Sequence, residues 1–321
     1  MQDIREPVVL TARPDAPAPG RAGRARRRRQ QLLAWAFLVP LVAYLVLCYG
    51  YPLATNIDLS LRGYTVRTFV HGGAPLVWFD NYVTVFGDPT FRTALLDTFV
   101  FTAASLLFQY GIGLAMAVFF ARNFRLGPTL RALFLVPWLL PLIVSGSTWA
   151  WLLNSESGVV NSVLGWFGAG KIDWLTSPSW SLVSVIIANI WIGVPFNLVL
   201  LYSGLQAIPQ ELYEAAALDG AGWWRRFRAI TVPQIRPEVF VVVITATVGA
   251  LKVFAPVLIL TGGGPEGSTV VPSYYSYRNF FELSKVGYGS AIATAMSIVI
   301  FLVAGVMLWL QRRGAREEAA G

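Results

Sequence analysis

Residues 291–310 read AIATAMSIVIFLVAGVMLWL, a continuous run without a charged side chain. A helix of roughly 20 apolar residues is long enough to cross the hydrocarbon core of a bilayer. Inside lipid, every backbone N–H and C=O must find its partner within the protein, and an α-helix provides all of these partners within one segment. The run is therefore predicted to be a transmembrane helix.

Other apolar stretches of similar length precede it, at residues 32–54, 94–120, 132–153, 182–202 and 239–260, the last of which contains Lys252. Over the whole chain 55% of residues are hydrophobic and 13% are charged, against roughly 25% charged in a typical soluble domain. These features predict an all-α integral membrane protein of about six transmembrane helices. One transmembrane domain, residues 31–311, is expected between a basic, disordered tail (1–30) and a short C-terminal tail (312–321).

The basic residues predict the orientation of the chain. Arg26, Arg27, Arg28 and Arg29 immediately precede the first apolar stretch, and further basic clusters occupy alternate loops and the C-terminal tail. Because Lys and Arg of short loops are retained on the cytoplasmic side, both termini are expected in the cytoplasm. The net charge of +8 is thereby explained by topology, and a nucleic-acid partner is not expected. Trp166, Trp174 and Trp180, on the opposite side, are typical of an interfacial aromatic belt.

Several kinds of chemistry are disfavoured by what the chain contains. It has one cysteine, Cys48, and one histidine, His71, so neither an internal disulfide nor a cysteine metal site is expected. The run from Gly165 to Lys171 is close to a phosphate-binding P-loop, but Ile172 stands where the motif needs Ser or Thr. A membrane enzyme would need clustered His, Asp or Glu. The chain is therefore expected not to be an enzyme, and to bind no cofactor of its own.

The most informative loop is the predicted cytoplasmic segment at residues 204–237. Pro209 suits the first turn of a helix, Glu211 lies where the helix dipole favours negative charge, and three alanines at 215–217 have high helix propensity. Gly220 is well placed to end this helix in a left-handed conformation. A second short helix over residues 223–230, stopped by Pro233, would complete a compact helical hairpin.

The residue order of this hairpin resembles the EAA signature of the permease subunits of ABC importers, and most closely the maltose and glycerol-phosphate type. The signature is carried by Glu214-Ala215-Ala216, then Gly220, Ile230, Pro233 and Pro237. The resemblance implies a type I ABC importer transmembrane domain whose coupling helices dock on cytoplasmic ATPases. The residues it assigns to coupling are Glu211, Glu214, Ala215, Ala216, Asp219, Gly220, Ala221 and Pro233.

The same resemblance implies the partners and the solute. They would be a second permease subunit, identical or different, two ATP-binding subunits that hold ATP and Mg²⁺, and an extracytoplasmic solute-binding protein. The cargo would be a sugar or related solute, and the location the cell membrane. Asp97 departs from the family pattern, because an Asn-Thr pair is usual at 97–98.

Candidate residues of the solute pathway are Asn189, Asn197 and Lys252. A charge within a membrane helix is costly and tends to face a cavity or a partner, although Lys252 could also snorkel or form an ion pair. The two asparagines could instead form hydrogen bonds between helices. A stand-alone carrier coupled to ions or protons is the alternative function. It would need buried carboxylates, and Asp97 is the one candidate within the predicted helices.

Overall fold

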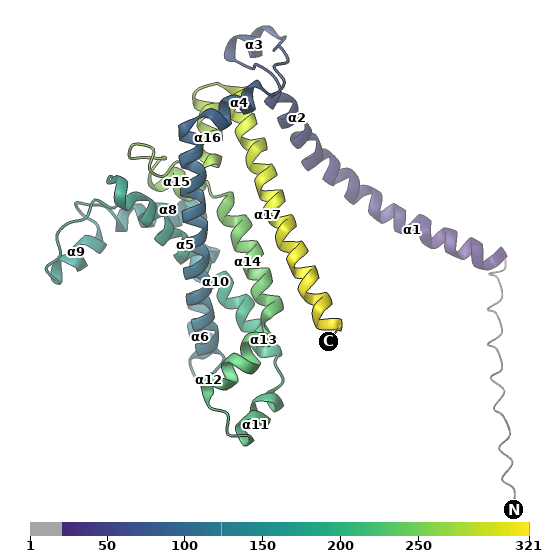
Figure 1. Cartoon of the computed structure of the whole chain (residues 1–321), viewed down its shortest axis with the longest axis vertical. Helices are drawn as coiled ribbons and strands as arrows, with labels where there is room; N and C mark the ends of the chain where they lie inside the picture. The colour runs from purple at the N-terminus through teal and green to yellow at the C-terminus, as the bar shows by residue number, and fades with distance from the viewer. Residues whose placement is uncertain (1–20, 123, 321) are drawn as a thin grey trace, which may run out of the picture. The chain divides into compact units, whose positions relative to one another are not determined.

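The computed structural model describes residues 21–122 and 124–320 (Figure 1). Within these ranges the chain is helical, and its one β-type pairing is an isolated bridge between Arg62 and Leu76. The chain divides into two units, residues 1–55 and 56–321. Of the disordered tail predicted at 1–30, residues 1–20 lie outside the described residues, and residues 21–30 form the start of α1 (Arg21–Leu45) rather than a disordered segment.

The described part of the first unit is one helical path, basic over residues 21–29 and mostly apolar from residue 32 onward. It runs through α1 (Arg21–Leu45), a π-helical turn (Val46–Gly50) and the start of α2 (Tyr51–Ser60). Residues 35–60 are long and apolar enough to span a membrane, and the most apolar 18-residue window of that span is not buried inside the protein. Side chains such as Phe37 and Leu47 are exposed. An exposed apolar helix of this length is suited to lipid rather than to water.

The second unit begins with short helices on one end of a bundle. These are α3 (Val66–His71) and α4 (Asp80–Gly87), which lead into the long helix α5 (Pro89–Phe120). Asp88 caps α5: its Oδ1 accepts a hydrogen bond from the Thr90 N–H at 2.8 Å, and Pro89 occupies the first turn, where a missing N–H costs nothing.

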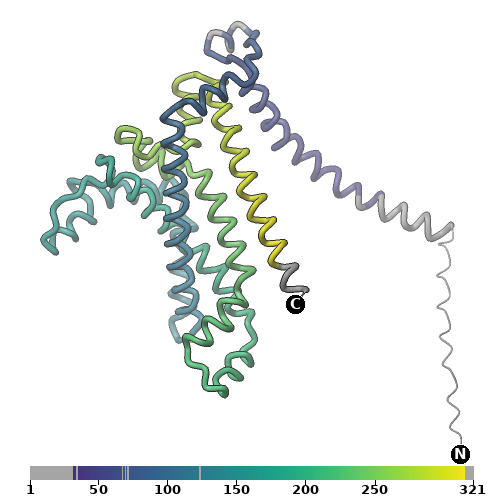
Figure 2. Tube along the Cα trace, viewed as in Figure 1, coloured from purple at the N-terminus to yellow at the C-terminus, as the bar shows by residue number. Residues whose placement is uncertain are grey.

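The bundle continues with α6 (Gly127–Phe134), α7 (Val136–Leu139), α8 (Leu142–Leu152), α9 (Val159–Trp166) and α10 (Pro178–Ala207). A helical hairpin follows, formed by α11 (Gln210–Leu218), α12 (Trp223–Arg226), the π-helical turn η2 (Phe227–Thr231) and α13 (Val232–Gln234). The chain ends with α14 (Arg236–Leu251), α15 (Ala255–Leu260), α16 (Pro272–Tyr277), the π-helical turn η3 (Arg278–Glu282) and α17 (Val286–Ala320). Figure 2 traces this path: α5, α10, α14 and α17 form the long bundle, and the α11–α13 hairpin lies at one end.

The predicted number of spans agrees with the structure, but two predicted helices are broken. Four described helices are long and apolar enough to cross a membrane, and the number rises to six if each of two bent pairs is one span. In the stretch 132–153 the chain bends by 95° between α7 and α8. Leu140 is extended there (ψ 141°), because the ring of Pro141 excludes the helical conformation from the preceding residue.

The stretch 239–260 is broken as well. Helix α14 ends at Leu251, and Phe254 (φ −140°, ψ −60°) precedes α15. Lys252 thus does not lie inside a continuous helix, as the sequence suggested; it is an exposed residue at the carboxyl end of α14. A cation is favourable at that end, because the last carbonyl groups carry partial negative charge.

Close packing of α5 against α10 forms the centre of the second unit. A Cβ atom added to Gly113 would lie 2.6 Å from the Cβ of Asn197, and one added to Gly193 would lie 2.4 Å from the side-chain amide of Gln109. Gln109 Nε2 donates to the Asn189 carbonyl at 2.9 Å. The glycines therefore allow a helix contact that any larger residue would prevent.

Candidate functional site

Helix α11 has the capping that its sequence predicts. It starts after Pro209, with Glu211 in its first turn. Gly220 ends it with φ +73°, the left-handed conformation that glycine adopts without strain. Its N–H donates to the Ala217 carbonyl at 3.0 Å, and the Ala221 N–H donates to the Ala216 carbonyl at 2.9 Å. These two bonds satisfy carbonyl groups at the helix end, so the predicted role of Gly220 in ending the helix is confirmed.

The second half of the hairpin differs from the prediction. A helical segment does start at Trp223, but it continues past residue 230, through η2 and α13, to Gln234. Pro233 lies one residue before the end of this segment, which stays helical as far as Gln234. The direction changes after Gln234, where the chain bends by 65° into α14.

Two contacts stabilise the hairpin. The hydroxyl groups of Tyr213 and Thr231 lie 2.8 Å apart, and Thr231 is buried, so α11 is joined to η2 by a shielded hydrogen bond. The rings of Trp223 and Trp224 both stack on Phe227, with centroid distances of 5.5 and 5.7 Å. Aromatic pairs at such distances contribute about 0.5–1.5 kcal/mol each. The hairpin is therefore a packed unit rather than a loose loop.

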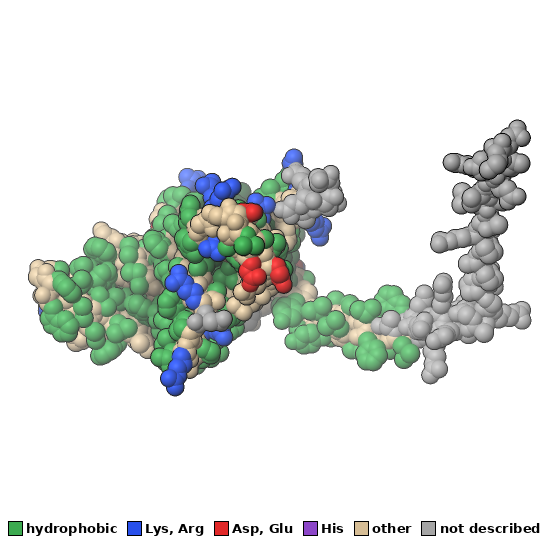
Figure 3. Space-filling model, turned by 90° about the horizontal axis from the view of Figure 1, so that it is seen from below, with side chains coloured by type: hydrophobic (Ala, Val, Ile, Leu, Met, Phe, Trp, Pro, Cys, Tyr) green, Lys and Arg blue, Asp and Glu red, His purple; other side chains and the backbone are tan. Residues whose placement is uncertain are grey.

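The outer surface of the hairpin is open and partly apolar. Leu218 is 91% exposed, and Trp223 and Trp224 are exposed as well. Most of the predicted coupling residues share this surface: Glu211, Glu214, Ala215, Asp219 and Gly220 are exposed, whereas Ala216, Ala221 and Pro233 are half-buried. Figure 3 views the molecule from this end, where Lys and Arg side chains surround a smaller group of Asp and Glu.

A cavity of about 640 Å³ lies behind the hairpin. Its lining combines the ends of α5 and α10 with α11, α12 and η2, and includes Gln206, Tyr213, Arg226 and Phe227. The hairpin therefore contacts the bundle on one side only and leaves its outer face free for another protein.

A second hollow, of about 290 Å³, lies between α5, α10 and α14 near the middle of the bundle. Asn189 and Asn197 both line it, together with Gln109, Trp138 and Thr245. Asn189 Nδ2 donates to Ser105 Oγ at 3.1 Å. Asn197 is 1% exposed; its Nδ2 donates to the Gly193 carbonyl, and its Oδ1 has no hydrogen-bond partner. An unsatisfied buried oxygen is a potential acceptor for a polar ligand.

Of the three predicted pathway residues, the structure thus brings two together and separates the third. Lys252 is not among the residues that line the hollow. Sequence reasoning missed Gln109, although a lone glutamine in the apolar stretch 94–120 was a readable signal. The sequence also does not place Trp138 in this hollow, since only the bend at Pro141 brings α7 against α10, where Trp138 contacts Phe196 at 5.8 Å between ring centroids.

The described residues contain no group of three or more His, Cys, Asp or Glu side chains that could hold a metal ion. The two candidate sites are a partly polar hollow in the helical bundle and an exposed helical hairpin at one end. Together with the candidate spans, these features define a multispan membrane protein.

Comparison with known proteins gives the family. Residues 109–316 match the family described as "Binding-protein-dependent transport system inner membrane component". The chain belongs to this family, and the expectation drawn from the EAA hairpin is confirmed. It is 35% identical to the sulfoquinovosyl glycerol transport system permease protein SmoG of Agrobacterium fabrum, over 88% of this chain and 91% of that protein. It is 34% identical to the trehalose/maltose transport system permease protein MalF of Thermococcus litoralis, over 85% and 91% of the two chains.

A solved structure shows the same fold. A chain of a bacterial ABC transporter that imports the acidic polysaccharide alginate superposes with a TM-score of 0.77 at 24% identity, covering 90% of this chain and 98% of that one. The predicted fold class, a type I ABC importer transmembrane domain, is thereby confirmed. The chain is a membrane-embedded permease component of a binding-protein-dependent importer.

Proposed function

We propose that this permease carries a sugar or a related polar solute, delivered by an extracytoplasmic binding protein, and that ATP hydrolysis in separate subunits drives the transport. The names of the relatives support the solute class, since they refer to sulfoquinovosyl glycerol and to trehalose or maltose. A related structure is described as a complex with an alginate-bound periplasmic protein, which supports a binding-protein partner. A second permease subunit, identical or different, completes the pore.

The α11–α13 hairpin is the part of this chain that contacts the ATPase subunits and moves with them. The observation that carries this role is the combination of a rigid, capped helix with an open outer surface: Gly220 and the Tyr213–Thr231 bond fix the hairpin, while Glu214 and Leu218 face outward. A rigid body transmits a push that a flexible loop would absorb. The ATPases bind ATP and Mg²⁺, and this chain binds neither. The hairpin and both termini lie in the cytoplasm.

The hollow beside Asn189 and Asn197 is the weak solute site. Amide groups suit sugar hydroxyls because they both donate and accept hydrogen bonds, and Trp138 offers an apolar ring against which a sugar face can pack. Weak, partly polar binding is what transport requires, because a tightly held solute would not be released.

Gly220 provides the sharpest test of the coupling role. A Cβ at this position would meet no atom within 4 Å, but φ is +73°, so the limit is conformational and not steric. Gly220→Val should abolish uptake driven by ATP while the protein stays in the membrane, because a β-branched residue is strained at positive φ. Gly220→Asn is the matched control and should retain most uptake, since asparagine tolerates this conformation.

Equal uptake by the valine and asparagine variants would contradict the coupling role. The alternative, a carrier coupled to ions or protons, has one supporting observation: Asp97 Oδ2 on α5 is buried without a hydrogen-bond partner. That carrier would transport solute in vesicles that contain only this chain and an ion gradient, whereas the proposed importer would not.

A further inference from the structure

The segment between α8 and α10 forms a small lobe of its own, and its helix α9 has a one-sided apolar surface. At about 100° per residue, positions 159, 163, 166 and 167 fall on one face of the helix. All four are apolar and exposed, and Trp166 and Phe167 are 82% and 83% exposed. Two large aromatic side chains in this state are unusual unless something outside the protein covers them.

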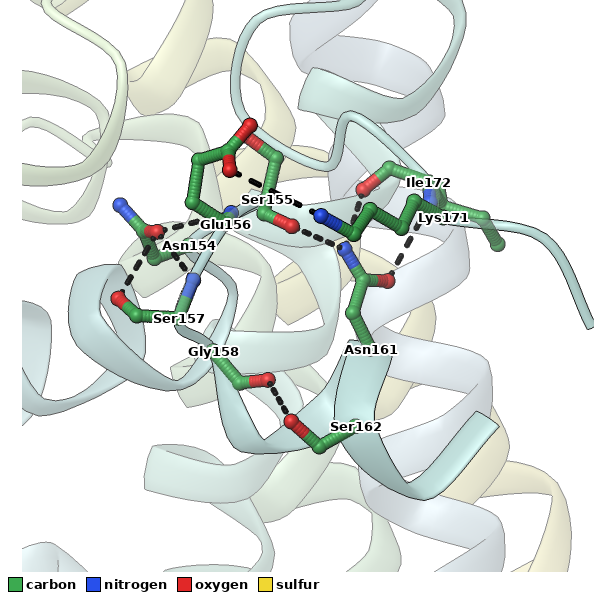
Figure 4. Close-up of polar contacts among 9 residues, drawn as sticks. All are labelled: Asn154, Ser155, Glu156, Ser157, Gly158, Asn161, Ser162, Lys171 and Ile172. Carbon is green, nitrogen blue, oxygen red and sulfur yellow. Dashed lines mark hydrogen bonds and ion pairs between the residues drawn. The ribbon is translucent and has the colours of Figure 1, made fainter. Parts of the chain in front are cut away.

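The opposite face of α9 is fixed by Asn161, which is buried. Its Nδ2 donates to the Ser155 carbonyl at 3.1 Å and to the Ile172 carbonyl at 2.9 Å. Its Oδ1 accepts from the Ile172 N–H at 3.3 Å and from Trp174 Nε1 at 2.9 Å. The Asn161 side chain thus joins α9 to the loop segments that precede and follow it in the chain (Figure 4).

The chain held on the Asn161 side is polar. Lys171 and Glu156 form an exposed ion pair with an N–O distance of 3.7 Å, and Figure 4 shows both beside Asn161. Asp173 is also exposed. Trp174, by contrast, is buried and faces inward. The lobe therefore has an apolar side made by α9 and a charged side made by its flanking loops.

The position of α9 in the chain restricts what can cover its apolar side. It lies between α8 and α10, both of which belong to candidate membrane spans. Only residues 153–158 separate it from α8, whose own Ile143, Val144 and Trp151 are exposed apolar side chains. The bilayer surface is thus within a few residues of both ends of the lobe, and a short helix with an aromatic face and a polar opposite face is typical of that interface.

We propose that α9 is an interfacial membrane anchor. It lies flat on the bilayer, Val163, Trp166 and Phe167 enter the boundary between headgroups and acyl chains, and the loops held by Asn161 face water. The ligand is a lipid surface, bound by apolar burial and not by a specific headgroup. The anchor fixes the depth at which the broken span that contains α8 and the continuous span α10 leave the membrane.

Spin labels on single cysteines test the anchor in the full chain. Cys48 is the one native cysteine, so Cys48→Ser gives a clean background. Labels are placed at Val163→Cys and Phe167→Cys on the apolar face. The matched controls are Gly165→Cys on the opposite face, where an added Cβ meets no atom within 4 Å, and Asp173→Cys in the polar loop. The protein is reconstituted in vesicles of phosphatidylethanolamine and phosphatidylglycerol.

Collision rates with oxygen, which concentrates in lipid, and with a water-soluble nickel chelate report the environment of each label. The logarithm of the oxygen-to-nickel ratio should be positive at 163 and 167 and negative at 165 and 173. Nickel accessibility at 167 equal to that at 173 would overturn the proposal. So would a label at 163 or 167 that neither reagent reaches, since a protein partner would then cover the face. Two sites on the apolar face keep the test valid if one variant does not fold.

Discussion

The contact between α5 and α10 can be tested with a pair of glycines two residues apart in the same helix. Gly113→Ala adds a methyl group 2.6 Å from the Cβ of Asn197, whereas Gly111→Ala adds one with no atom within 4 Å. Ordinary carbon contacts lie at about 3.5–4.0 Å. The helices would therefore have to separate by roughly 1 Å to accept the methyl group at position 113.

The magnitude follows from two opposing terms. Overpacking of this kind costs about 1–3 kcal/mol. Replacing a helical glycine with alanine gains about 0.5–1 kcal/mol, and this gain is common to both variants. Gly111→Ala should thus be neutral or slightly stabilising, and Gly113→Ala should be less stable than Gly111→Ala by about 1–3 kcal/mol, the overpacking term alone.

Unfolding of the purified protein in a detergent–denaturant titration measures this difference. The Gly113→Ala variant should also show weaker solute uptake, because Asn197 lines the central hollow. Equal stability of the two variants would refute the close packing of α5 on α10, since the propensity terms cancel and the contact is what distinguishes the two positions.

Two further predictions concern the α9 lobe and the carboxylate of Asp88. Asn161→Ala should destabilise the α9 lobe by about 1–3 kcal/mol, because the indole N–H of the buried Trp174 loses its acceptor. Faster proteolysis or hydrogen exchange confined to residues 154–174 is the readout, and unchanged protection would contradict it. Asp88 is partly buried, which raises the pKa of its carboxyl, but hydrogen bonds from Tyr275, Tyr288 and Thr90 outweigh burial and hold that pKa below its usual value. The contribution of the Asp88 carboxylate to stability is present above the unfolded pKa and is lost as the pH falls through the lowered folded pKa. Asp88→Asn should therefore flatten the loss of stability below about pH 4. An identical dependence of unfolding free energy on pH in the two proteins would contradict this.

Local chain chemistry predicted the first half of the hairpin in detail, because the start and end of α11 depend on neighbouring residues. Gly220 ends α11 through its own backbone freedom, and the length of the apolar stretches predicted the spans. Proline was harder to interpret. Pro141 breaks a predicted helix, because it forces the preceding residue into an extended conformation. The segment around Pro233, by contrast, stays helical as far as Gln234.

The central hollow could be predicted only in part. Asn189 and Asn197 are polar residues in an apolar helix, which is visible in the sequence. Gln109 and Trp138 lie beside these asparagines because glycines allow α5 to pack closely on α10 and because the chain bends at Pro141. Both are tertiary features. The prediction that Lys252 lies within a helix was wrong for a similar reason, because the hydrophobic pattern of the sequence does not reveal the break between α14 and α15.

Cysteine crosslinking from the hairpin tests the coupling role most directly. Ala215→Cys in the Cys48→Ser background places a thiol on the exposed surface of α11. In cells that also contain the transporter's ATP-binding subunit, a short bifunctional reagent should join the two chains, and the yield should change when ATP is bound. A thiol at 215 that a membrane-impermeant reagent labels from outside the cell, or solute transport by the purified chain alone, would contradict the account.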